Sequence, residues 1–576
     1  MKSRWRRLGM LVTLVALMAV LERSTAAPLQ GHELDPLRLA SAEVWSRDHE
    51  LLSLRANDQG ERCAWRQLEE LDARVVDVFV AAEDQRFFEH AGVDLRAIAR
   101  AALRGGSGAS TISMQLARLV RPHRRTLSGK LAEALLAVRL ERTLSKHDIL
   151  EQYLNRVPLG RNIRGVEAAA WAYFGHSART LSLAEAGLLA ALAPAPSRLD
   201  PRESPQAARV ARDQLLTRLA ARGQLPAEDV ATSAAVPVAP PAGWPERAAH
   251  VVASVPSAPG QTRLLIDAAA QSHVEAIARS HRQRLAILGA DAIAIVVIEH
   301  RTNGLVALVG SFAFDEPPSG QVNHAKAARQ AGSALKPFLY ALLLEDGASP
   351  ETPVPDVARG FREGESIFLP RNNDDLFRGM VPLRVALGSS FNVPAVATAE
   401  LVGLARFRST LESLGLRLER PTESYGLGLA LGVADVRLLD LTSAFSVFAR
   451  AGVWSPPRVL ADEEVVPETR VFSAATAQAI FEILSDEQAR VPGFGEYAHL
   501  GLPFPVALKT GTSSAARDFW ALGSTAEHTV GVWAGNSNGS PAADTVSIEV
   551  AVPILVDVFA ALANAPVRLP FDSIDD

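Results

Sequence analysis

The strongest constraint on the fold is a set of three short motifs in the second half of the 576-residue chain. In order, they are Ser333-x-x-Lys336, Ser390-x-Asn392 and Lys509-Thr510-Gly511-Thr512. On a helix, residues three apart share one face, so the Ser333 hydroxyl and the Lys336 amine are expected within hydrogen-bond reach. A lysine kept neutral by its surroundings can take the serine proton, which predicts a serine nucleophile with a lysine base.

The spacing of these motifs is more specific than any one of them. Their first residues lie 57 and 119 positions apart, and a lone SxxK occurs by chance in a chain of this length. The third motif follows a short apolar run that predicts a strand. Gly511 on that strand would let a substrate backbone approach closely.

A proline-rich stretch divides the chain. Residues 234–262 contain six prolines, which predicts a linker rather than a packed element. Before it, residues 71–230 show Leu/Ala-rich helical periodicity. After it, residues 263–281 predict a strand and a helix, and residues 292–310 predict a hairpin closed by Asn303-Gly304. We therefore expect a multidomain chain: a mainly α domain, a linker, and an α/β or α+β domain.

The run VFVAAEDQRFFEHAG, residues 78–92, places two acids at the end of an apolar segment. At helical period Val76, Val80, Glu83 and Phe87 form one stripe, and Asp84 lies off it. A carboxyl group held against apolar side chains has a raised pKa and accepts protons well near neutral pH. The alternative is an amphipathic helix with an imperfect stripe.

The N-terminus predicts export. Lys2, Arg4, Arg6 and Arg7 precede residues 8–21, which carry no charge, and basic residues stay on the cytoplasmic side. Fourteen apolar residues are typical of a signal-peptide core, and Ser24-Thr25-Ala26 could end a cleavage site. An uncleaved signal anchor within residues 1–27 is the alternative.

Composition excludes several function classes. Charged residues make up 21% of the chain and the net charge is −5, which gives no basis for a nucleic-acid partner. The single cysteine, Cys63, excludes an internal disulfide and a cysteine-rich metal site.

The ordered motifs SxxK, SxN and KTG are the signature of serine penicillin-binding proteins and their β-lactamase relatives. The first half adds EDQRFFEHAG, GASTISMQLARLVRPH, GKLAEALLAVRLE, KHDILEQYLN and RGVEAAAWAYFG. Together these resemble the class A, bifunctional penicillin-binding proteins. The runs PLGRNIRGVEAAAWAYFGHSA and ALAPAPSRLDP are most similar to the 1C type.

This resemblance implies the domain plan. Residues 71–230 would form a mainly α, lysozyme-like glycosyltransferase domain, and residues 263–565 a D,D-transpeptidase (penicillin-binding) domain of α/β (α+β) class. The remainder would be an exported segment 28–70, the linker 231–262 and a tail 566–576. Relatives of the 1C type often carry a further C-terminal domain, which we expect to be missing here.

In the second domain the resemblance implies acyl transfer through a serine acyl-enzyme. Ser333 would attack the bond between two terminal D-alanines, with Lys336 as general base, Ser390 relaying the proton and Asn392 orienting the substrate amide. Lys509, Thr510 and Thr512 would hold the terminal carboxylate, next to Gly511. The backbone N–H groups of Ser333 and Thr512 would form the oxyanion hole.

In the first domain the resemblance makes Glu83 the base that deprotonates the 4-hydroxyl of the acceptor lipid II. That oxygen would displace undecaprenyl pyrophosphate with inversion. Glu133 would be a second essential carboxylate at the donor. Helical phase puts it with Glu141 opposite Leu131, Leu135 and Val138, so a surface glutamate paired with Lys130 is the alternative.

Cations would stabilise the leaving pyrophosphate. Lys130 and Arg118 are the candidates, and Ser110, Thr111 and Gln115 would line the groove. Many relatives have arginine where this chain has Gly129, so Arg121, Arg124 or Arg125 could supply the lost charge. The glycine-rich LRGGSGAS just before, residues 103–110, predicts a mobile segment near the cleft.

The resemblance further implies an inner-membrane protein with one N-terminal pass and periplasmic catalytic domains. Expected partners are lipid II, nascent peptidoglycan, the membrane and β-lactams as covalent inhibitors, with other cell-wall proteins left open. No metal or cofactor is required, although a divalent cation at the pyrophosphate is compatible. Two alternatives remain: a carboxypeptidase-type second domain that uses water, or inactive domains that act as a cell-wall scaffold.

Overall fold

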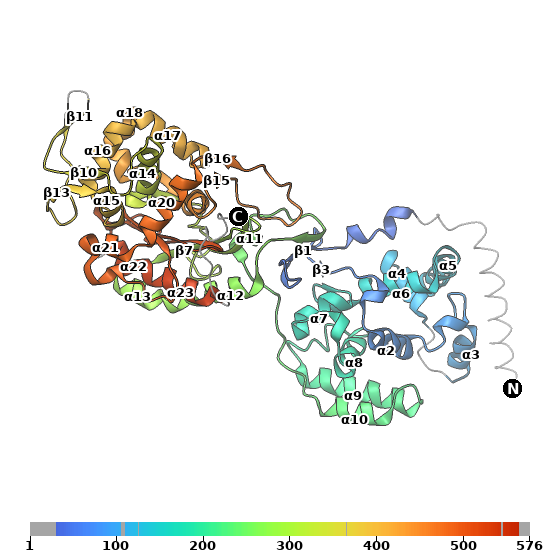
Figure 1. The fold of residues 1–576 in the computed structure, drawn as a ribbon. Coiled ribbons are helices and arrows are strands. Elements are labelled where there is room, and N and C mark those ends of the chain that lie inside the picture. The colour runs from blue at the N-terminus through green and yellow to red at the C-terminus, as the bar shows by residue number, and fades with distance from the viewer. Residues whose placement is uncertain (1–29, 105–109, 125, 364–365, 543–544, 564–576) are drawn as a thin grey trace, which may run out of the picture. The chain divides into compact units, whose positions relative to one another are not determined.

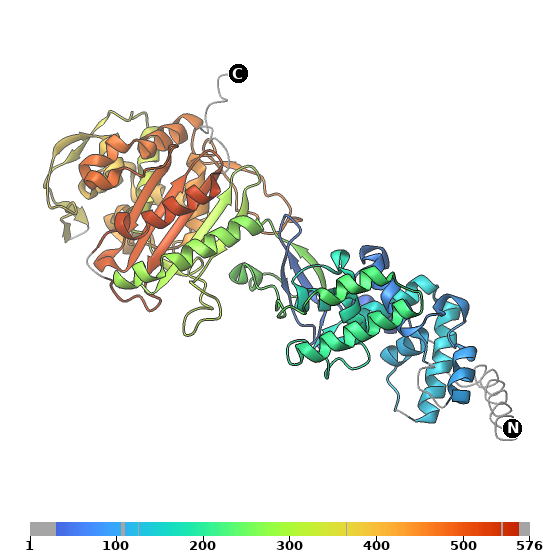
Figure 2. The same ribbon diagram turned by 90° about the horizontal axis from the view of Figure 1, so that it is seen from below.

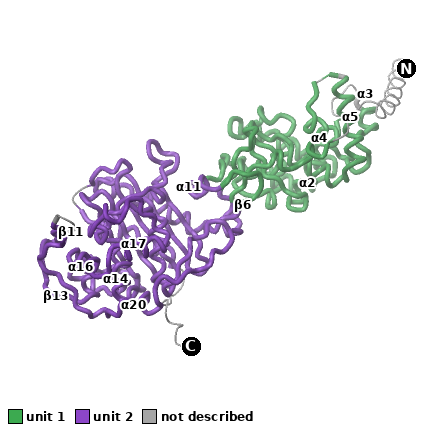
Figure 3. The backbone as a smooth tube through the Cα atoms, turned by 90° about the horizontal axis from the view of Figure 1, so that it is seen from above, with its two compact units in different colours: residues 1–44, 53–246, 256–262 green, residues 45–52, 247–255, 263–576 purple. Residues whose placement is uncertain are grey.

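The computed structural model describes residues 30–104, 110–124, 126–363, 366–542 and 545–563. They form two compact units (Figures 1 and 3). The first unit is the described part of Met1–Val44, Ser53–Glu246 and Pro256–Thr262, and the second is that of Trp45–Leu52, Arg247–Val255 and Arg263–Asp576. No helix in these ranges is long and apolar enough to cross a membrane. The apolar run 8–21 lies outside them, as does the tail 566–576.

The first unit is mainly helical, as predicted. Its helices are α2 (Ala73–Glu83), α3 (Leu95–Arg104), α4 (Ile112–Val120), α5 (Leu127–Thr143), α6 (Lys146–Arg156), α7 (Val166–Phe174), α8 (Leu183–Leu192), α9 (Pro205–Ala221) and α10 (Ala227–Ala235). Its strands include β3 (Arg62–Cys63), β4 (Pro158–Gly160) and β5 (Ile163–Arg164), and the residues of β1 (Ala42–Trp45) and β2 (Leu51–Leu54) are divided between the two units. Side chains cap α2, α4, α5, α6 and α8 at Asp72, Thr111, Thr126, Ser145 and Ser182, which fixes where each helix begins.

Two groups of helices build the core of this unit. Helix α4 packs against α5 and α6, and α8 packs against α2 and α9. The rings of Phe79 on α2 and Tyr153 on α6 meet edge to face with centroids 6.4 Å apart. This contact holds α2 beside α6.

The proline-rich stretch contains more regular structure than predicted. Helix α11 (Ala249–Val252) and strand β6 (Gly260–Arg263) fall within or at the end of residues 234–262, and β6 extends the sheet in the order β2-β1-β6. The prolines lie at positions 237, 240, 241, 245, 256 and 259. The helical turn occupies the gap between them and the strand begins after the last, so no proline interrupts a backbone hydrogen bond.

The second unit contains a five-stranded antiparallel sheet in the order β17-β18-β19-β7-β8 (Figure 2). Its strands are β7 (Ala292–Glu299), β8 (Gly304–Val309), β17 (Ala507–Thr512), β18 (Asp518–Ser524) and β19 (His528–Gly535). The predicted hairpin over 292–310 is therefore confirmed, as is the strand that carries the third motif.

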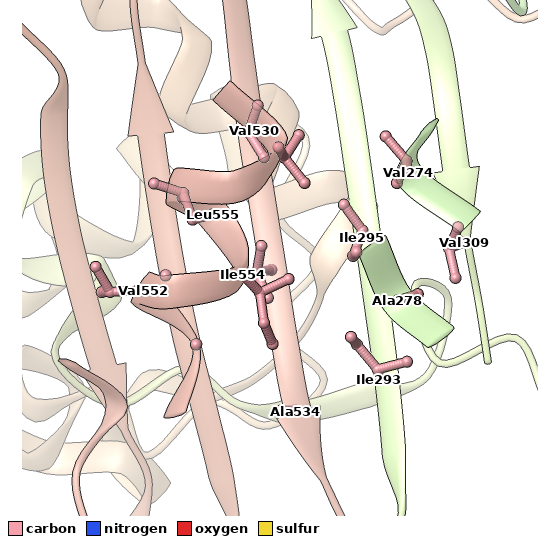
Figure 4. Packing of buried hydrophobic residues seen from close by; sticks show 14 of the residues in the cluster. Val274, Ala278, Ile293, Ile295, Val309, Val530, Ala534, Val552, Ile554 and Leu555 are labelled. Carbon is pink, nitrogen blue, oxygen red and sulfur yellow. The ribbon is translucent and has the colours of Figure 1, made fainter. Parts of the chain in front are cut away.

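Helices cover both faces of this sheet. Helices α12 (Ala268–Ser280) and α23 (Val552–Leu562) lie on one face, where Val274, Ile295, Val530 and Leu555 share one apolar cluster (Figure 4). On β19, Gly531 points the other way, and a Cβ there would lie 1.9 Å from the Thr442 hydroxyl on α19 (Leu438–Phe445). The sheet is thus the middle layer of the unit.

The remaining elements of the second unit are short. The helices are α13 (Arg282–Ile287), α14 (Lys336–Glu345), α15 (Leu383–Gly388), α16 (Asn392–Val402), α17 (Leu404–Ser413), α18 (Thr422–Tyr425), α20 (Ala474–Ser485), α21 (Glu487–Phe494) and α22 (Ser547–Val550). The strands form two-stranded ribbons: β9 (Ala328–Gln330) with β14 (Asp435–Arg437), β10 (Pro353–Asp356) with β13 (Gly379–Pro382), β11 (Phe361–Glu363) with β12 (Ser366–Phe368), and β15 (Val453–Trp454) with β16 (Thr469–Arg470).

Candidate active sites

The three motifs of the second unit come from three different elements. Ser333 lies in the 3-10 turn Gly332–Leu335 that leads into α14, and Lys509 to Thr512 form the end of β17. This turn packs tightly on β17, because a Cβ on Gly511 would lie 2.3 Å from the Ala331 carbonyl oxygen. We expected Gly511 to give a substrate backbone room to approach the strand. In the structure, the backbone of the turn at Ala331 and Ala334 occupies that space instead.

Lys336 is completely buried, and three acceptors hold its ammonium group. Its Nζ donates to the carbonyl oxygens of Ser390 (2.7 Å) and Phe391 (3.1 Å) and to Oδ1 of Asn392 (2.7 Å). Burial, and secondarily the charge of Lys509, place the pKa of Lys336 well below its usual range. Among the described residues no hydrogen bond joins Lys336 to the Ser333 hydroxyl, because the amine is directed at segment 390–392. Burial therefore shifts this lysine toward its neutral form.

Ser390 lies between the two buried lysines. It occupies the left-handed backbone region with φ 60°, in the turn between α15 and α16. Its Oγ accepts from the Lys509 Nζ at 2.8 Å, while its carbonyl oxygen accepts from Lys336. Burial lowers the pKa of Lys509 to about 7. Ser390 can therefore exchange a proton with one amine and stay close to the other.

The side chain of Asn392 is fully engaged by the protein. Its Oδ1 accepts from Lys336, and its Nδ2 donates to the Arg371 carbonyl oxygen (2.9 Å) and to Oδ1 of Asn373 (3.2 Å). These two partners belong to a loop around Asn372 that the sequence motifs did not predict. The only signal for it was the turn-forming run PRNND, residues 370–374.

A cavity of about 860 Å³ opens beside Ser333. The predicted residues that line it are Ser333, Ser390, Asn392, Thr510 and Thr512, and the loop residues are Phe368, Asn372, Asn373 and Asp374. The Thr512 hydroxyl is held by that of Ser547 at 2.8 Å. Hydroxyl groups from all three motifs therefore line one cavity, and Ser390 among them is hydrogen-bonded to both buried lysines.

In the first unit, Glu83 is the last residue of α2. The predicted phase of this helix was wrong: its buried residues are Val75, Val78 and Phe79, whereas Val76 and Val80 are half-buried. Periodicity also ends here, because Asp84 has φ −156° and caps the helix.

Glu83 nevertheless has the predicted electrostatics. Its side chain is half-buried, and desolvation raises the pKa of its carboxyl group even though a hydrogen bond from Gln115 opposes the shift. The Gln115 Nε2 donates to Glu83 at 2.7 Å, and the Tyr153 hydroxyl donates to Gln115 Oε1 at 3.2 Å. Tyr153 thereby fixes the amide so that its N–H group faces the carboxylate.

Asp84 is a structural acid, buried at 7% exposure, although the predicted phase placed it off the packed face. Its carboxylate contacts His90 Nε2 at 3.0 Å and accepts the backbone N–H of Ile112, also at 3.0 Å. Thr111 caps α4 and donates to the Gly92 carbonyl oxygen at 2.6 Å. These bonds tie residues 84–92 to the start of α4.

Glu133 is buried and paired with Arg118. Two hydrogen bonds of 2.7 and 2.8 Å join the guanidinium to the carboxylate, and Glu133 is 4% exposed. The predicted phase of α5 was wrong, because Leu131, Leu135 and Val138 are only half-buried. The alternative of a surface glutamate paired with Lys130 does not hold: the described contacts of Glu133 are with Arg118, and Lys130 is exposed.

Helix α4 connects the two carboxylates. Gln115 binds Glu83, and Arg118, three residues later on the same face, binds Glu133. Four of the predicted residues therefore converge on one stripe of α4, with Thr111 at its start. Ser110 is exposed just before it.

The glycine at position 129 has a packing reason. A Cβ there would lie 2.1 Å from the Arg124 carbonyl oxygen, so any side chain would displace the loop that covers the first turn of α5. Of the suggested replacement cations, Arg121 is bound to Glu33 at 2.6 and 2.7 Å and Arg124 is exposed. Arg125 and most of the glycine-rich run lie outside the described residues. Within those residues, no cluster of three or more His, Cys, Asp or Glu could hold a metal ion.

Two different family models match the two halves of the chain. The Transglycosylase family model matches residues 49–220, and the model of the penicillin-binding protein transpeptidase domain matches residues 293–536. A crystal structure of penicillin-binding protein 1A from Haemophilus influenzae is similar in fold, with a TM-score of 0.54 and 18% identity over 92% of this chain and 94% of that one.

Curated relatives cover most of the chain. It is 28% identical to penicillin-binding protein 1A of Aquifex aeolicus, over 88% of this chain and 85% of the relative. It is 35% identical to penicillin-binding protein 1C of Escherichia coli strain K12, over 95% of this chain and 70% of the relative. The chain therefore belongs to the class A penicillin-binding proteins of the 1C type, bifunctional peptidoglycan synthases with glycosyltransferase and transpeptidase activities.

Proposed function

We propose that Glu83 is the general base of glycan polymerisation. The observation that supports this role is its desolvated carboxylate, oriented by Gln115. The base takes the proton of the 4-hydroxyl of lipid II, and the oxygen forms a bond to the anomeric carbon of the growing chain. The bond from that carbon to undecaprenyl pyrophosphate breaks, with inversion.

The Arg118–Glu133 pair acts on the donor side of the same reaction. The pyrophosphate already leaves well, so a cation can replace the acid that glycoside hydrolysis requires. Arg118 supplies that charge, and Glu133 fixes the guanidinium through two hydrogen bonds. Lys130, exposed nearby on α5, supplies a second cation. Ser110 and Gln115 face the acceptor, whereas Thr111, which is 1% exposed, acts as the cap of α4.

In the second unit Ser333 forms the acyl-enzyme. Its oxygen bonds to the carbonyl carbon of the penultimate D-alanine while its proton moves to Lys336. The peptide bond breaks, and Ser390 relays a proton to the leaving D-alanine amine. An amine of a second stem peptide then attacks the ester and regenerates the serine. The backbone N–H groups of Ser333 and Thr512 stabilise the oxyanion.

Binding of the substrate carboxylate should depend on pH through Lys509. Its pKa is lowered to about 7, so its ammonium form is present below that pH and lost above it. We expect the pre-acylation dissociation constant for a β-lactam to rise about tenfold per pH unit above the pKa. Stopped-flow acylation between about pH 6 and 9 measures this constant separately from the acylation step. In Lys509→Arg the charge persists at every pH, so the trend should vanish, and a flat profile in the unmodified protein would refute the role.

Membrane association is the second part of the proposal. Both glycosyltransferase substrates carry long polyprenyl tails, so the cleft must open at a bilayer, and we place the catalytic domains in the periplasm behind one N-terminal pass within residues 1–27. Phe88 and Leu95, just after the Glu83 helix, are 67% and 49% exposed. Exposed apolar groups near such a cleft suit contact with lipid.

A chain that begins at residue 28 should therefore still bind liposomes. Flotation should recover it with the vesicles, and the double change Phe88→Ser and Leu95→Ser should reduce that recovery severalfold. Val210→Ser is the matched control, because Val210 is 44% exposed on α9. Truncated protein that stays entirely in the soluble fraction would contradict the proposal.

The complete reaction is tested by incubating the purified full-length protein with lipid II. Glycan length reports on the first unit. Cross-linked stem peptides report on the second, whereas trimmed stem peptides without cross-links would indicate a carboxypeptidase.

A further inference from the structure

A buried acid–amide pair connects the loop after β12 to the start of α16. Asp356, the last residue of β10, is 0% exposed, and Asn372 is 4% exposed. The Asn372 Nδ2 donates to Asp356 at 2.7 Å and to the Leu376 carbonyl oxygen at 2.8 Å. The second oxygen of Asp356 accepts the backbone N–H of Arg378 at 3.1 Å. The pair is therefore fully hydrogen-bonded inside the protein.

The acid fixes the orientation of the amide. An ionised carboxylate only accepts hydrogen bonds, so Nδ2 of Asn372 must face Asp356 and Oδ1 must face the other way. There Oδ1 accepts the backbone N–H groups of Asn392 (2.8 Å) and Val393 (3.3 Å). These are the first two N–H groups of α16, and its N-cap residue, Phe391, provides no side-chain hydrogen bond. Asn372 thus caps α16 from 20 residues away in the sequence.

The capped segment is the one that holds the proposed base. All three acceptors of the Lys336 ammonium group lie in residues 390–392. One of these acceptors is Oδ1 of Asn392, and the backbone N–H group of the same residue donates to Asn372. A shift of this segment would therefore displace the Lys336 amine, and misplacement of a catalytic group by about 1 Å can cost about 10²-fold in rate.

We propose that Asn372, oriented by Asp356, is a positioning residue for acyl transfer. It holds segment 390–392, and with it the three acceptors that fix the position of the Lys336 amine. This inference rests on the proposed roles of Ser333 and Lys336 and adds two residues to them. Asn372 lines the cavity, but its Nδ2 and Oδ1 are both engaged by protein groups, so the expected effect is on the acylation step rather than on binding.

A donor–acceptor swap tests the proposal in the full-length protein. Asn372→Asp alone places two carboxylates at hydrogen-bond distance in a buried site, and its acylation rate constant should fall about 100-fold. Adding Asp356→Asn restores one donor and one acceptor, and the carboxylate introduced by Asn372→Asp then caps α16. The double variant should recover to within about tenfold of the unmodified protein. Leu369→Ala, which changes a side chain 68% exposed on the same loop, is the matched control and should change nothing.

The measurement is stopped-flow labelling with a fluorescent penicillin, expressed per titrated active site. A purely structural role would lower the melting temperature and the number of active sites but leave the rate constant of the remaining sites unchanged. That result would overturn the proposal, as would a double variant that regains stability but stays as slow as Asn372→Asp. If Asn372→Asp does not fold, Asn372→Ala removes the cap without adding charge, and a rate within twofold of the unmodified protein again overturns the proposal.

The same assay separates this inference from the function on which it rests. Persistent labelling of Ser333→Ala would show that Ser333 is not the nucleophile and would refute the proposed mechanism. Loss of labelling in Ser333→Ala together with a normal rate in Asn372→Ala would refute only the positioning role.

Discussion

Replacing Ser333 with alanine is expected to abolish covalent labelling by β-lactams and all cross-linking of stem peptides. The hydroxyl is the group that we propose forms the acyl bond, and Lys336, the proposed base, is completely buried. A residual rate from the oxyanion hole would not produce a covalent adduct. Gel detection of a fluorescent penicillin on the full-length protein measures the loss, and Ser280→Ala on α12 is a control that should label normally.

Glycan polymerisation in the same Ser333→Ala protein should stay close to normal. Glu83, Gln115, Arg118 and Glu133 all belong to the first unit, whereas Ser333 belongs to the second. A modest change is acceptable, because the product of one site is the substrate of the other. Two results would contradict the prediction: a labelled Ser333→Ala protein, or loss of polymerisation in a protein that remains folded.

The sequence identified residues that the fold of the second unit brings together, because they stand in short motifs. Ser333, Ser390, Asn392, Thr510 and Thr512 line one cavity, although their motifs are far apart in the chain. The strand assignment of the third motif and the preceding hairpin followed from apolar runs bounded by turn residues. Such runs determine where a strand lies without any knowledge of its partners.

Helical phase was the main failure, and its cause is physical. Helix α2 carries valine or phenylalanine at 75, 76, 78, 79 and 80, so apolar residues surround most of its circumference. Several stripes then fit the pattern equally well, and only packing against α8 and α9 selects Val75, Val78 and Phe79. Helix α5 has the same ambiguity, which hid the burial of Glu133. The pKa of Glu83 is raised, as predicted, although the predicted apolar stripe on α2 was wrong.

Long-range capping was invisible in the sequence for a different reason. Asn372 caps a helix 20 residues later, and Asp356 orients it from 16 residues earlier. Neither spacing matches a helix or strand period, so no local pattern marks the pair. The Glu133–Arg118 pair likewise joins two helices, and sequence reasoning named both residues without predicting that they bind each other.

Changing Glu83 to glutamine is expected to reduce the rate of lipid II polymerisation by about 10² to 10⁴-fold, because a positioned general base contributes about that factor. The amide keeps the size of the side chain, and its oxygen can still accept the hydrogen bond from Gln115 that the carboxylate accepts at 2.7 Å. The lost property is proton affinity. Glu89→Gln is the matched control, because the Glu89 side chain is 60% exposed, and it should polymerise at the unmodified rate.

The pH profile gives the same prediction an independent test. Glu83 must be ionised to accept a proton, and desolvation raises its pKa above the ordinary value of 4.5. Polymerisation by the unmodified protein should therefore increase with pH through a midpoint above 4.5, and the residual rate of Glu83→Gln should lack this step. Asp84→Asn should keep it, because Asp84 binds His90 and the start of α4 rather than Gln115. If Glu83→Gln extends glycan strands at nearly the unmodified rate, another residue is the base and the assignment of Glu83 is wrong.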